Sequence, residues 1–188
     1  MLSERIELNG RAFRLFIQRE EIAHVVHHLA QRIRQDYADK EPVCLIVLKG
    51  AFIFAADLLR QLSLPCTVEM IRARSYGAEM TSSGTVQIEP PVLNVRGKDV
   101  LLIEDIVDTG LTLRALVRFV EEHQPASLRI VTLLAKPPAR HLRVPLTYIG
   151  KEIPSVFVVG YGMDYAESGR GLPDIYAVET SVSGQSPP

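Results

Sequence analysis

The segment Val100-Leu101-Leu102-Ile103-Glu104-Asp105-Ile106-Val107-Asp108-Thr109-Gly110-Leu111-Thr112-Leu113 predicts a buried strand, a short acidic loop and the start of a helix. The aliphatic run 100–103 is too short for a helix and has no polar alternation, which is typical of a parallel strand covered on both faces. After Gly110, apolar residues recur at helical spacing as far as Glu122. Because ligands of open α/β sheets bind beyond the carboxyl ends of the strands, this loop is predicted to line a ligand site.

The predicted loop combines groups that suit an anion with groups that suit a cation. Gly110 allows a positive φ or a close approach to a ligand, and Thr109 and Thr112 can cap the helix or donate hydroxyl groups. The free amides and the dipole of a helix start favour phosphate. Carboxylates beside such a site would find partners in a magnesium ion or in sugar hydroxyls. The local chemistry also allows a plain polar loop whose acids face water, and at this point both interpretations stay open.

The whole chain has the length and charge of an ordinary globular domain. Its 188 residues fit one domain, expected at 1–180, followed by a disordered tail at 181–188. The net charge of −1 argues against a general nucleic-acid or membrane-surface binder. No apolar run approaches the ~20 residues of a transmembrane helix, and the first residues lack a signal-peptide pattern. Cys44 and Cys66 lie in apolar segments, so we expect buried free thiols and a cytoplasmic protein.

Apolar runs alternate with helical patterns along the chain, which predicts an α/β fold with a mostly parallel sheet flanked by helices. Helices are expected at 18–37, 51–62 and 111–122. Strands are expected at 43–48, 66–73, 85–89, 100–103, 127–135, 153–160 and 175–179, with a further short strand or arm within 2–16.

The run Glu104-Asp105-Ile106-Val107-Asp108-Thr109-Gly110-Leu111-Thr112, preceded by aliphatic residues, resembles the 5-phosphoribosyl 1-pyrophosphate (PRPP) loop of type I phosphoribosyltransferases. It is most similar to the hypoxanthine-guanine branch of that family. The resemblance implies a fold with a small hood from the terminal segments and a mobile loop. It also implies that Asp108 is the general base that removes the proton from purine N7, and that Mg²⁺ is bound with Glu104 and Asp105 among its ligands. The residues implied to bind the ribose and 5′-phosphate of PRPP are Glu104, Asp105, Asp108, Thr109, Gly110, Leu111 and Thr112.

Two further segments resemble family motifs that handle pyrophosphate and close the site. Leu48-Lys49-Gly50-Ala51-Phe52 is similar to the pyrophosphate loop, in which the peptide before the lysine is often cis. The residues themselves also fit a tight turn with a surface lysine. Ser75-Tyr76-Gly77 and Ser82-Ser83-Gly84 resemble the mobile catalytic loop, although a plain surface hairpin would have the same composition. Met80 stands where the related bacterial pattern has a threonine.

The purine end of the site is implied by residues in the last third of the chain. Pro137 holds Lys136 extended at a strand end, and Lys136 matches the lysine that contacts the purine 6-oxo group. Phe157 matches the aromatic residue that stacks on the base, and the backbone of Val158 would bind the edge of the base. Asp164 matches an acid in this purine segment that holds a second metal ion. The generic interpretations are a solvated lysine and a core phenylalanine.

Arg170 matches an arginine that contacts pyrophosphate, although the residues before it depart from the family pattern. Related chains tend to carry a bulky or basic pair where Ser168 and Gly169 stand, after Glu167. The departure concerns only this segment of the resemblance.

The resemblance implies a purine-salvage enzyme that converts hypoxanthine or guanine and PRPP into IMP or GMP and pyrophosphate. Two other classes stay open: a PRPP-sensing regulator that binds nucleic acid, and a transferase for another base such as xanthine or uracil. The neutral net charge weighs against the regulator, so no nucleic-acid partner and no membrane partner is expected. Family habit suggests a homodimer or homotetramer. The preference between hypoxanthine and guanine stays open.

Overall fold

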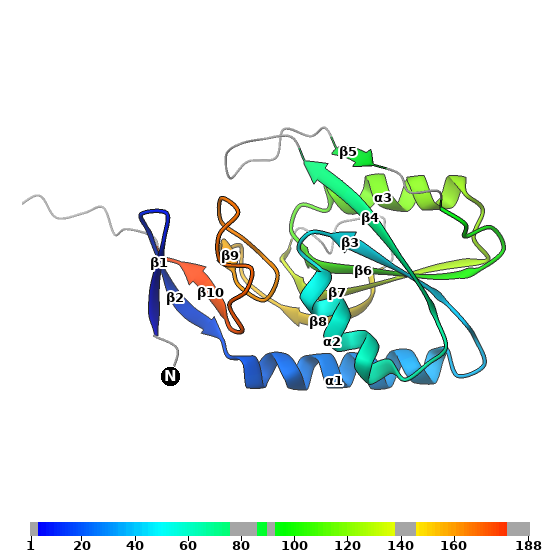
Figure 1. Cartoon of the computed structure of the whole chain (residues 1–188), viewed down its shortest axis with the longest axis horizontal. Helices are drawn as coiled ribbons and strands as arrows, with labels where there is room; N and C mark the ends of the chain where they lie inside the picture. The colour runs from blue at the N-terminus through cyan, green and yellow to red at the C-terminus, as the bar shows by residue number, and fades with distance from the viewer. Residues whose placement is uncertain (1–3, 76–85, 90–92, 138–145, 180–188) are drawn as a thin grey trace, which may run out of the picture.

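The computed structural model describes residues 4–75, 86–89, 93–137 and 146–179, and these residues form two β-sheets (Figure 1). The large sheet has the strand order β5-β4-β3-β6-β7-β8. The strands β4, β3, β6, β7 and β8 run parallel, and β5 is antiparallel at the edge. Its strands are β3 (Val43–Leu48), β4 (Thr67–Ser75), β5 (Val86–Glu89), β6 (Asp99–Val107), β7 (Ser127–Ala135) and β8 (Leu146–Glu152). The small antiparallel sheet, here called the hood, consists of β1 (Arg5–Leu8), β2 (Arg11–Ile17), β10 (Ile175–Val178) and β9 (Val158–Val159). The predicted α/β class and the hood built from terminal segments are confirmed.

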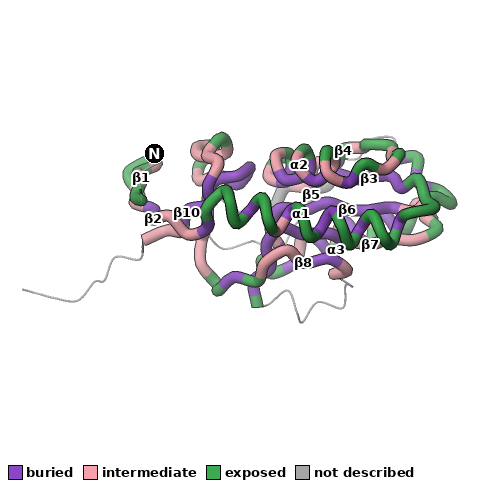
Figure 2. Tube along the Cα trace, turned by 90° about the horizontal axis from the view of Figure 1, so that it is seen from below, coloured by how far each residue is buried: buried purple, intermediate pink, exposed green. Residues whose placement is uncertain are grey.

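Helices cover both faces of the large sheet. The helices α1 (Arg19–Asp36) and α2 (Phe52–Leu62) pack on one face, and α3 (Leu111–Glu122) packs on the other (Figure 1). Each face of the sheet has its own hydrophobic core, and alternate residues of β6 pack into one or the other. Leu101 packs against α1 and α2, whereas Leu102 packs against α3. Figure 2 shows the inner strands as buried and the outward turns of α1 as exposed. This double cover explains why the strands read as continuous apolar runs.

The order of the strands reverses between β3 and β6. The chain leaves β3 through α2 and returns on one side as β4, and it leaves β6 through α3 and returns on the other side as β7. The connections therefore diverge at the carboxyl ends of β3 and β6. Such a switch point leaves a crevice at which open α/β sheets bind ligands.

The central strand is longer than predicted, and two acids lie within it. Pairing between β6 and β7 continues through Glu104 opposite Thr132 and ends at Val107 opposite Ala135. The prediction that Glu104 and Asp105 belong to a loop is therefore wrong, because ladder hydrogen bonds outweigh the low strand propensity of acids. Only 108–110 separate the strand from α3.

The prediction of a strand over 153–160 is also wrong, because the strand β9 consists of Val158–Val159 alone. Pro154 cannot donate to a ladder, and the chain leaves the large sheet after Ile153, whose amide donates to the carbonyl of Ala135. The strand β8 was not predicted, although its Leu-Thr-Tyr-Ile sequence favours a strand. Cys44 is buried as expected, whereas Cys66 is only half-buried.

Some predictions concern parts of the chain that the structure does not describe. Ser75 is the last residue of β4, while Tyr76 and the rest of the predicted mobile loop lie outside the described residues. The predicted tail at 181–188 lies outside them as well. Within the described ranges, every helix is too short or too polar to cross a lipid bilayer.

Candidate functional site

A cavity of about 420 Å³ lies at the switch point between β3 and β6. It brings together residues from five separate segments of the chain. Most of the predicted site residues line it: Lys49, Gly50, Glu104, Asp105, Asp108, Thr112, Lys136, Phe157, Val158, Asp164 and Arg170. The hydrophobic lining includes Val47, Ile106 and Met163, which were not predicted because their residue types carry no chemical signal in the sequence.

A smaller cavity of about 90 Å³ adjoins the start of α3. It is lined by Glu104, Asp108, Thr109, Gly110 and Thr112 among others, whereas Leu111 lines neither cavity. Gly110 has a φ of 73°, as the glycine in this turn predicted. The first bond of α3 runs from the Arg114 amide to the Gly110 carbonyl, so the preceding amides have no partner within the helix. This geometry suits a phosphate group.

Glu104 and Asp105 are buried carboxyl groups at the floor of the larger cavity. Both are 7 % exposed, and neither forms a salt bridge with any described residue. Burial raises the pKa of Glu104, and the neighbouring charge of Asp105 raises that pKa further. Burial also raises the pKa of Asp105, while the amide of Ile106, which donates to its Oδ1 at 2.8 Å, opposes the increase. Two buried carboxylates without a cationic partner suit a divalent cation.

The turn after β3 touches Asp105 directly. The Leu48–Lys49 peptide bond is cis, as the family resemblance suggested for this position. At Gly50 a β-carbon would overlap Oδ2 of Asp105, which is side chain from the neighbouring strand. Any side chain at position 50 would therefore displace the Asp105 carboxylate, because the predicted pyrophosphate loop lies directly against this acid of β6.

Gly50→Ala is expected to lower both thermal stability and affinity for PRPP, because the new methyl group displaces the Asp105 carboxylate. Overpacking costs typically 1–3 kcal/mol, which for a chain of this size lowers Tm by roughly 3–10 °C. Thermal denaturation and PRPP titration measure the two effects.

The matched control for this variant is Gly171→Ala, because a β-carbon at Gly171 meets no atom within 4 Å. The control should keep the wild-type Tm and PRPP affinity. Equal behaviour of the two variants would show that the contact between Gly50 and Asp105 has no consequence for the site.

Lys136 and Asp108 form an ion pair across the purine end of the cavity. Nζ of Lys136 lies 2.6 Å from Oδ2 of Asp108, and the lysine side chain is 9 % exposed while that of Asp108 is 55 % exposed. The Lys136 amide donates to the Val107 carbonyl at 2.9 Å, which fixes the lysine at the end of β7. The ammonium has three donors, so the pair with Asp108 leaves donors for a ligand.

The hood supplies the opposite wall of this end of the cavity. Phe157 is half-buried, and its ring lies near those of Phe13 and Tyr165, with centroids 6.4 and 5.8 Å away. Val158 begins β9 and is buried. Phe157 therefore lines the cavity and at the same time packs in the hood.

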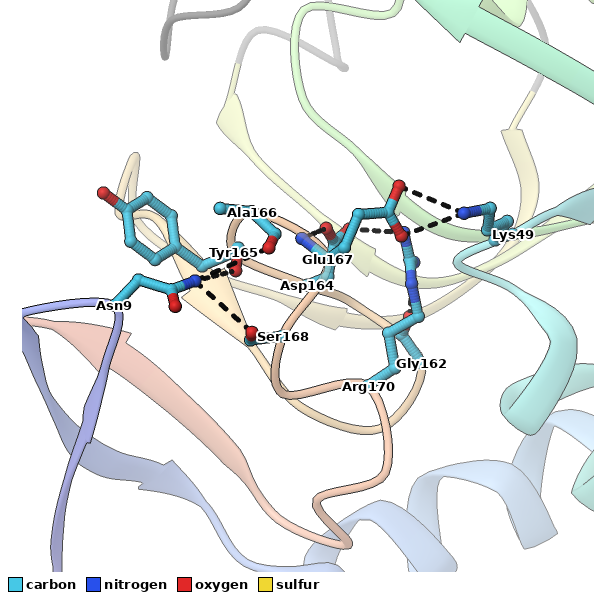
Figure 3. A network of polar contacts seen from close by, with 9 residues as sticks. All are labelled: Asn9, Lys49, Gly162, Asp164, Tyr165, Ala166, Glu167, Ser168 and Arg170. Atoms are coloured by element: carbon cyan, nitrogen blue, oxygen red, sulfur yellow. Dashed lines mark hydrogen bonds and ion pairs between the residues drawn. The ribbon is translucent and has the colours of Figure 1, made fainter.

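The remaining predicted residues belong to one polar network (Figure 3). Arg170 donates from Nη1 to the Gly162 carbonyl at 2.9 Å, and its Nη2 lies 2.7 Å from Oδ1 of Asp164. Asp164 is thus paired with a cation, and no three acid, histidine or cysteine side chains of the described residues form a metal cluster. Glu167 joins the network by contacting both Lys49 and Arg170. Glu167 was not among the predicted site residues, because the sequence showed only that the segment after it departs from the family pattern.

Comparisons with known proteins agree with this geometry. The family model of the phosphoribosyl transferase domain matches residues 17–166. A hypoxanthine-guanine phosphoribosyltransferase of Aquifex aeolicus is 39 % identical over 92 % of this chain and 98 % of its own length, and that of Dictyostelium discoideum is 44 % identical over 82 % and 88 %. The crystal structure of a Bacillus anthracis hypoxanthine-guanine phosphoribosyltransferase has a TM-score of 0.81 at 40 % identity and covers 88 % of this chain and 98 % of that chain. The chain therefore belongs to the phosphoribosyltransferase family, in its hypoxanthine-guanine branch.

Proposed function

We propose that this protein is a purine-salvage enzyme that transfers the 5-phosphoribosyl group of PRPP to N9 of hypoxanthine or guanine. The products are IMP or GMP and pyrophosphate. The observation that carries the proposal is a pair of cavities that share Glu104, Asp108 and Thr112 and together join a helix start with free amides, two buried carboxylates and a buried lysine. Family membership over most of the chain supports the same reaction.

Each part of PRPP has a matching part of the site. The 5′-phosphate binds the turn 108–112, where it accepts hydrogen bonds from the free amides at the start of α3 and from the hydroxyls of Thr109 and Thr112. Glu104 and Asp105 accept hydrogen bonds from the ribose hydroxyls. The pyrophosphate group binds at the other side of the cavity, against Lys49, the amide of Gly50 and Arg170.

Glu104 and Asp105 are the residues that would hold Mg²⁺. Their burial without a cationic partner fits such an ion, and Mg²⁺ usually takes one or two carboxylates and completes its shell with water and substrate phosphates. When bound, the ion neutralises charge on the leaving pyrophosphate. Asp164 is the candidate for a second ion, in exchange for its pair with Arg170.

The base binds between the hood and the end of β7. Phe157 stacks on the ring, the backbone of Val158 binds its edge, and Lys136 donates to the 6-oxo group. Asp108 accepts the proton from purine N7 while the bond from N9 to the ribose forms. The ribose carries positive charge as pyrophosphate leaves, and the carboxylates of the site stabilise that charge.

PRPP-dependent nucleotide formation, measured with hypoxanthine, guanine, xanthine, adenine and uracil in parallel, tests this function. We expect product from hypoxanthine or guanine in the presence of Mg²⁺. Chelation with EDTA should abolish turnover, and excess Mg²⁺ should restore it, because the buried carboxylates of 104 and 105 need a divalent partner.

Other outcomes would redirect the proposal. Product from xanthine, adenine or uracil alone would leave the PRPP site intact and overturn the purine assignment of Lys136 and Phe157. PRPP binding without product from any base would indicate a regulator, which a gel shift with RNA would then test. Turnover that persists in EDTA would overturn the metal assignment.

The proposal includes a cytoplasmic location, which the free thiols of Cys44 and Cys66 support. It also includes a homodimer or homotetramer. The large side chains of Phe52, Val68 and Met70 are exposed by 44 %, 43 % and 53 %, which favours self-association near α2 and β4. Sedimentation velocity measures the state directly.

A further inference from the structure

Glu167 lies between the two cations that are assigned to pyrophosphate (Figure 3). Its carboxylate accepts hydrogen bonds from Nζ of Lys49 at 2.9 and 3.0 Å, one to each oxygen. Oε2 also lies 3.4 Å from Nη2 of Arg170. Lys49 and Arg170 come from distant parts of the chain, and this single acid bridges the two cavity-lining cations.

The backbone holds Glu167 in this place. Its amide donates to Oδ2 of Asp164 at 2.8 Å, and its φ of 62° lies in the left-handed region, which residues other than glycine rarely adopt. Asn9, in the hairpin turn of the hood, donates to the carbonyl of Tyr165 at 3.2 Å and to Oγ of Ser168 at 3.3 Å. The turn that contains Glu167 is therefore held by Asp164 and by Asn9, and the Glu167 carboxylate points toward Lys49 and Arg170 (Figure 3).

We propose that Glu167 is an internal counter-ion that competes with the pyrophosphate group for Lys49 and Arg170, and thereby sets the affinity of the site for pyrophosphate. The inference rests on the proposed function, because it concerns the group that PRPP brings and the product that leaves. Carboxylate oxygens and phosphate oxygens accept from the same ammonium and guanidinium donors, so both cannot hold them at once.

The balance of charge and exposure allows this exchange. Both carboxylate oxygens of Glu167 accept hydrogen bonds from the Lys49 ammonium, which is the geometry of an ion pair. Its side chain is 69 % exposed and that of Lys49 is 43 % exposed, which makes the pair weak and easily displaced. Pyrophosphate carries more charge and more acceptors than one carboxylate, so it displaces Glu167 from Lys49 and Arg170. Breaking the existing ion pairs costs part of the free energy of pyrophosphate binding. Weaker binding favours release of the product.

The test is Glu167→Gln, which keeps the size of the side chain and removes its charge. Isothermal titration of the full chain with pyrophosphate should give a Kd lower than wild type by roughly two- to tenfold, as expected for the loss of exposed ion pairs. Pyrophosphate should also become a stronger product inhibitor by a similar factor. The affinity for IMP and GMP should stay unchanged, because neither nucleotide carries the pyrophosphate group that Lys49 and Arg170 are proposed to bind.

Glu179→Gln is the matched control, because Glu179 also bridges two cations, accepting from Nε of Arg5 at 3.0 Å and of Arg14 at 3.4 Å, but in the hood and away from the cavity. It should leave pyrophosphate affinity unchanged. Glu167→Ala, measured in parallel, should tighten pyrophosphate binding in the same direction, and thermal denaturation confirms that each variant is folded.

Unchanged or weaker pyrophosphate binding in folded Glu167→Gln and Glu167→Ala would overturn the counter-ion role. Tighter binding in Glu179→Gln as well would also overturn it, because a general change in net charge would then explain the effect. If wild-type protein makes IMP or GMP while the variants bind pyrophosphate as it does, only this inference fails. If wild-type protein binds neither PRPP nor pyrophosphate, the proposed function fails with it.

Discussion

Asp108→Asn should reduce turnover by roughly 10²–10⁴-fold, the range that general acid–base catalysis usually contributes. The amide keeps the shape of the side chain and an oxygen that can accept from Lys136 at the observed 2.6 Å, but it cannot take a proton from purine N7. The affinity for PRPP should change little, because the phosphate is held by backbone amides of the same turn. Single-turnover kinetics at saturating substrate, with PRPP titration, separate the two quantities.

Asp39→Asn serves as the control for this variant. Asp39 is exposed in a turn before β3, at the opposite end of the large sheet from the cavity, and its substitution should leave turnover unchanged. Near-normal turnover in Asp108→Asn would remove Asp108 from the role of general base. A large loss of PRPP affinity would instead assign Asp108 to phosphate binding.

Lys136→Ala is expected to weaken binding of hypoxanthine, guanine and their nucleotides by roughly tenfold to hundredfold. Hydrogen bonds to charged groups are worth about 1.5–3 kcal/mol, and this lysine is too deeply buried for water to replace its donors. Discrimination against adenine should also fall, because an ammonium donates to a 6-oxo group but cannot accept from a 6-amino group. The affinity for PRPP should stay within about twofold.

Lys151→Ala is the matched control. Lys151 lies on the neighbouring strand β8, its Nζ lies 2.6 Å from Oε1 of Glu21 in α1, and it does not line the cavity. Competition titrations with IMP, GMP and AMP measure both variants. Unchanged purine affinity in Lys136→Ala would mean that this lysine only neutralises Asp108.

The parts of the site that follow a local rule were predictable. Gly110 indicated that a positive φ was available before a helix, and Gly110 has the left-handed conformation directly before α3. Pro137 indicated that Lys136 would stand extended at a strand end, and Lys136 follows the last residue of β7. Rules of this kind depend on the backbone of neighbouring residues, so a single sequence contains them.

The predictions that were wrong or missing concern residues whose environment is set by segments far away in the chain. Glu104 and Asp105 look like loop residues until β7 is placed beside them, and Pro154 breaks an apolar run that reads as a strand. Glu167 meets Lys49, 118 residues away, and no spacing rule links the two.

The sequence by itself determined the fold class, the helix that begins after Gly110 and the chemical types of the site residues, because apolar periodicity and turn chemistry act over a few residues. Only the tertiary structure decided that Lys136 pairs with Asp108, that Gly50 touches Asp105 and that Glu167 bridges the pyrophosphate cations. These contacts arise where the strand order reverses and the hood meets the large sheet. They depend on the register and packing of segments that are distant in the chain, which local physical chemistry does not encode.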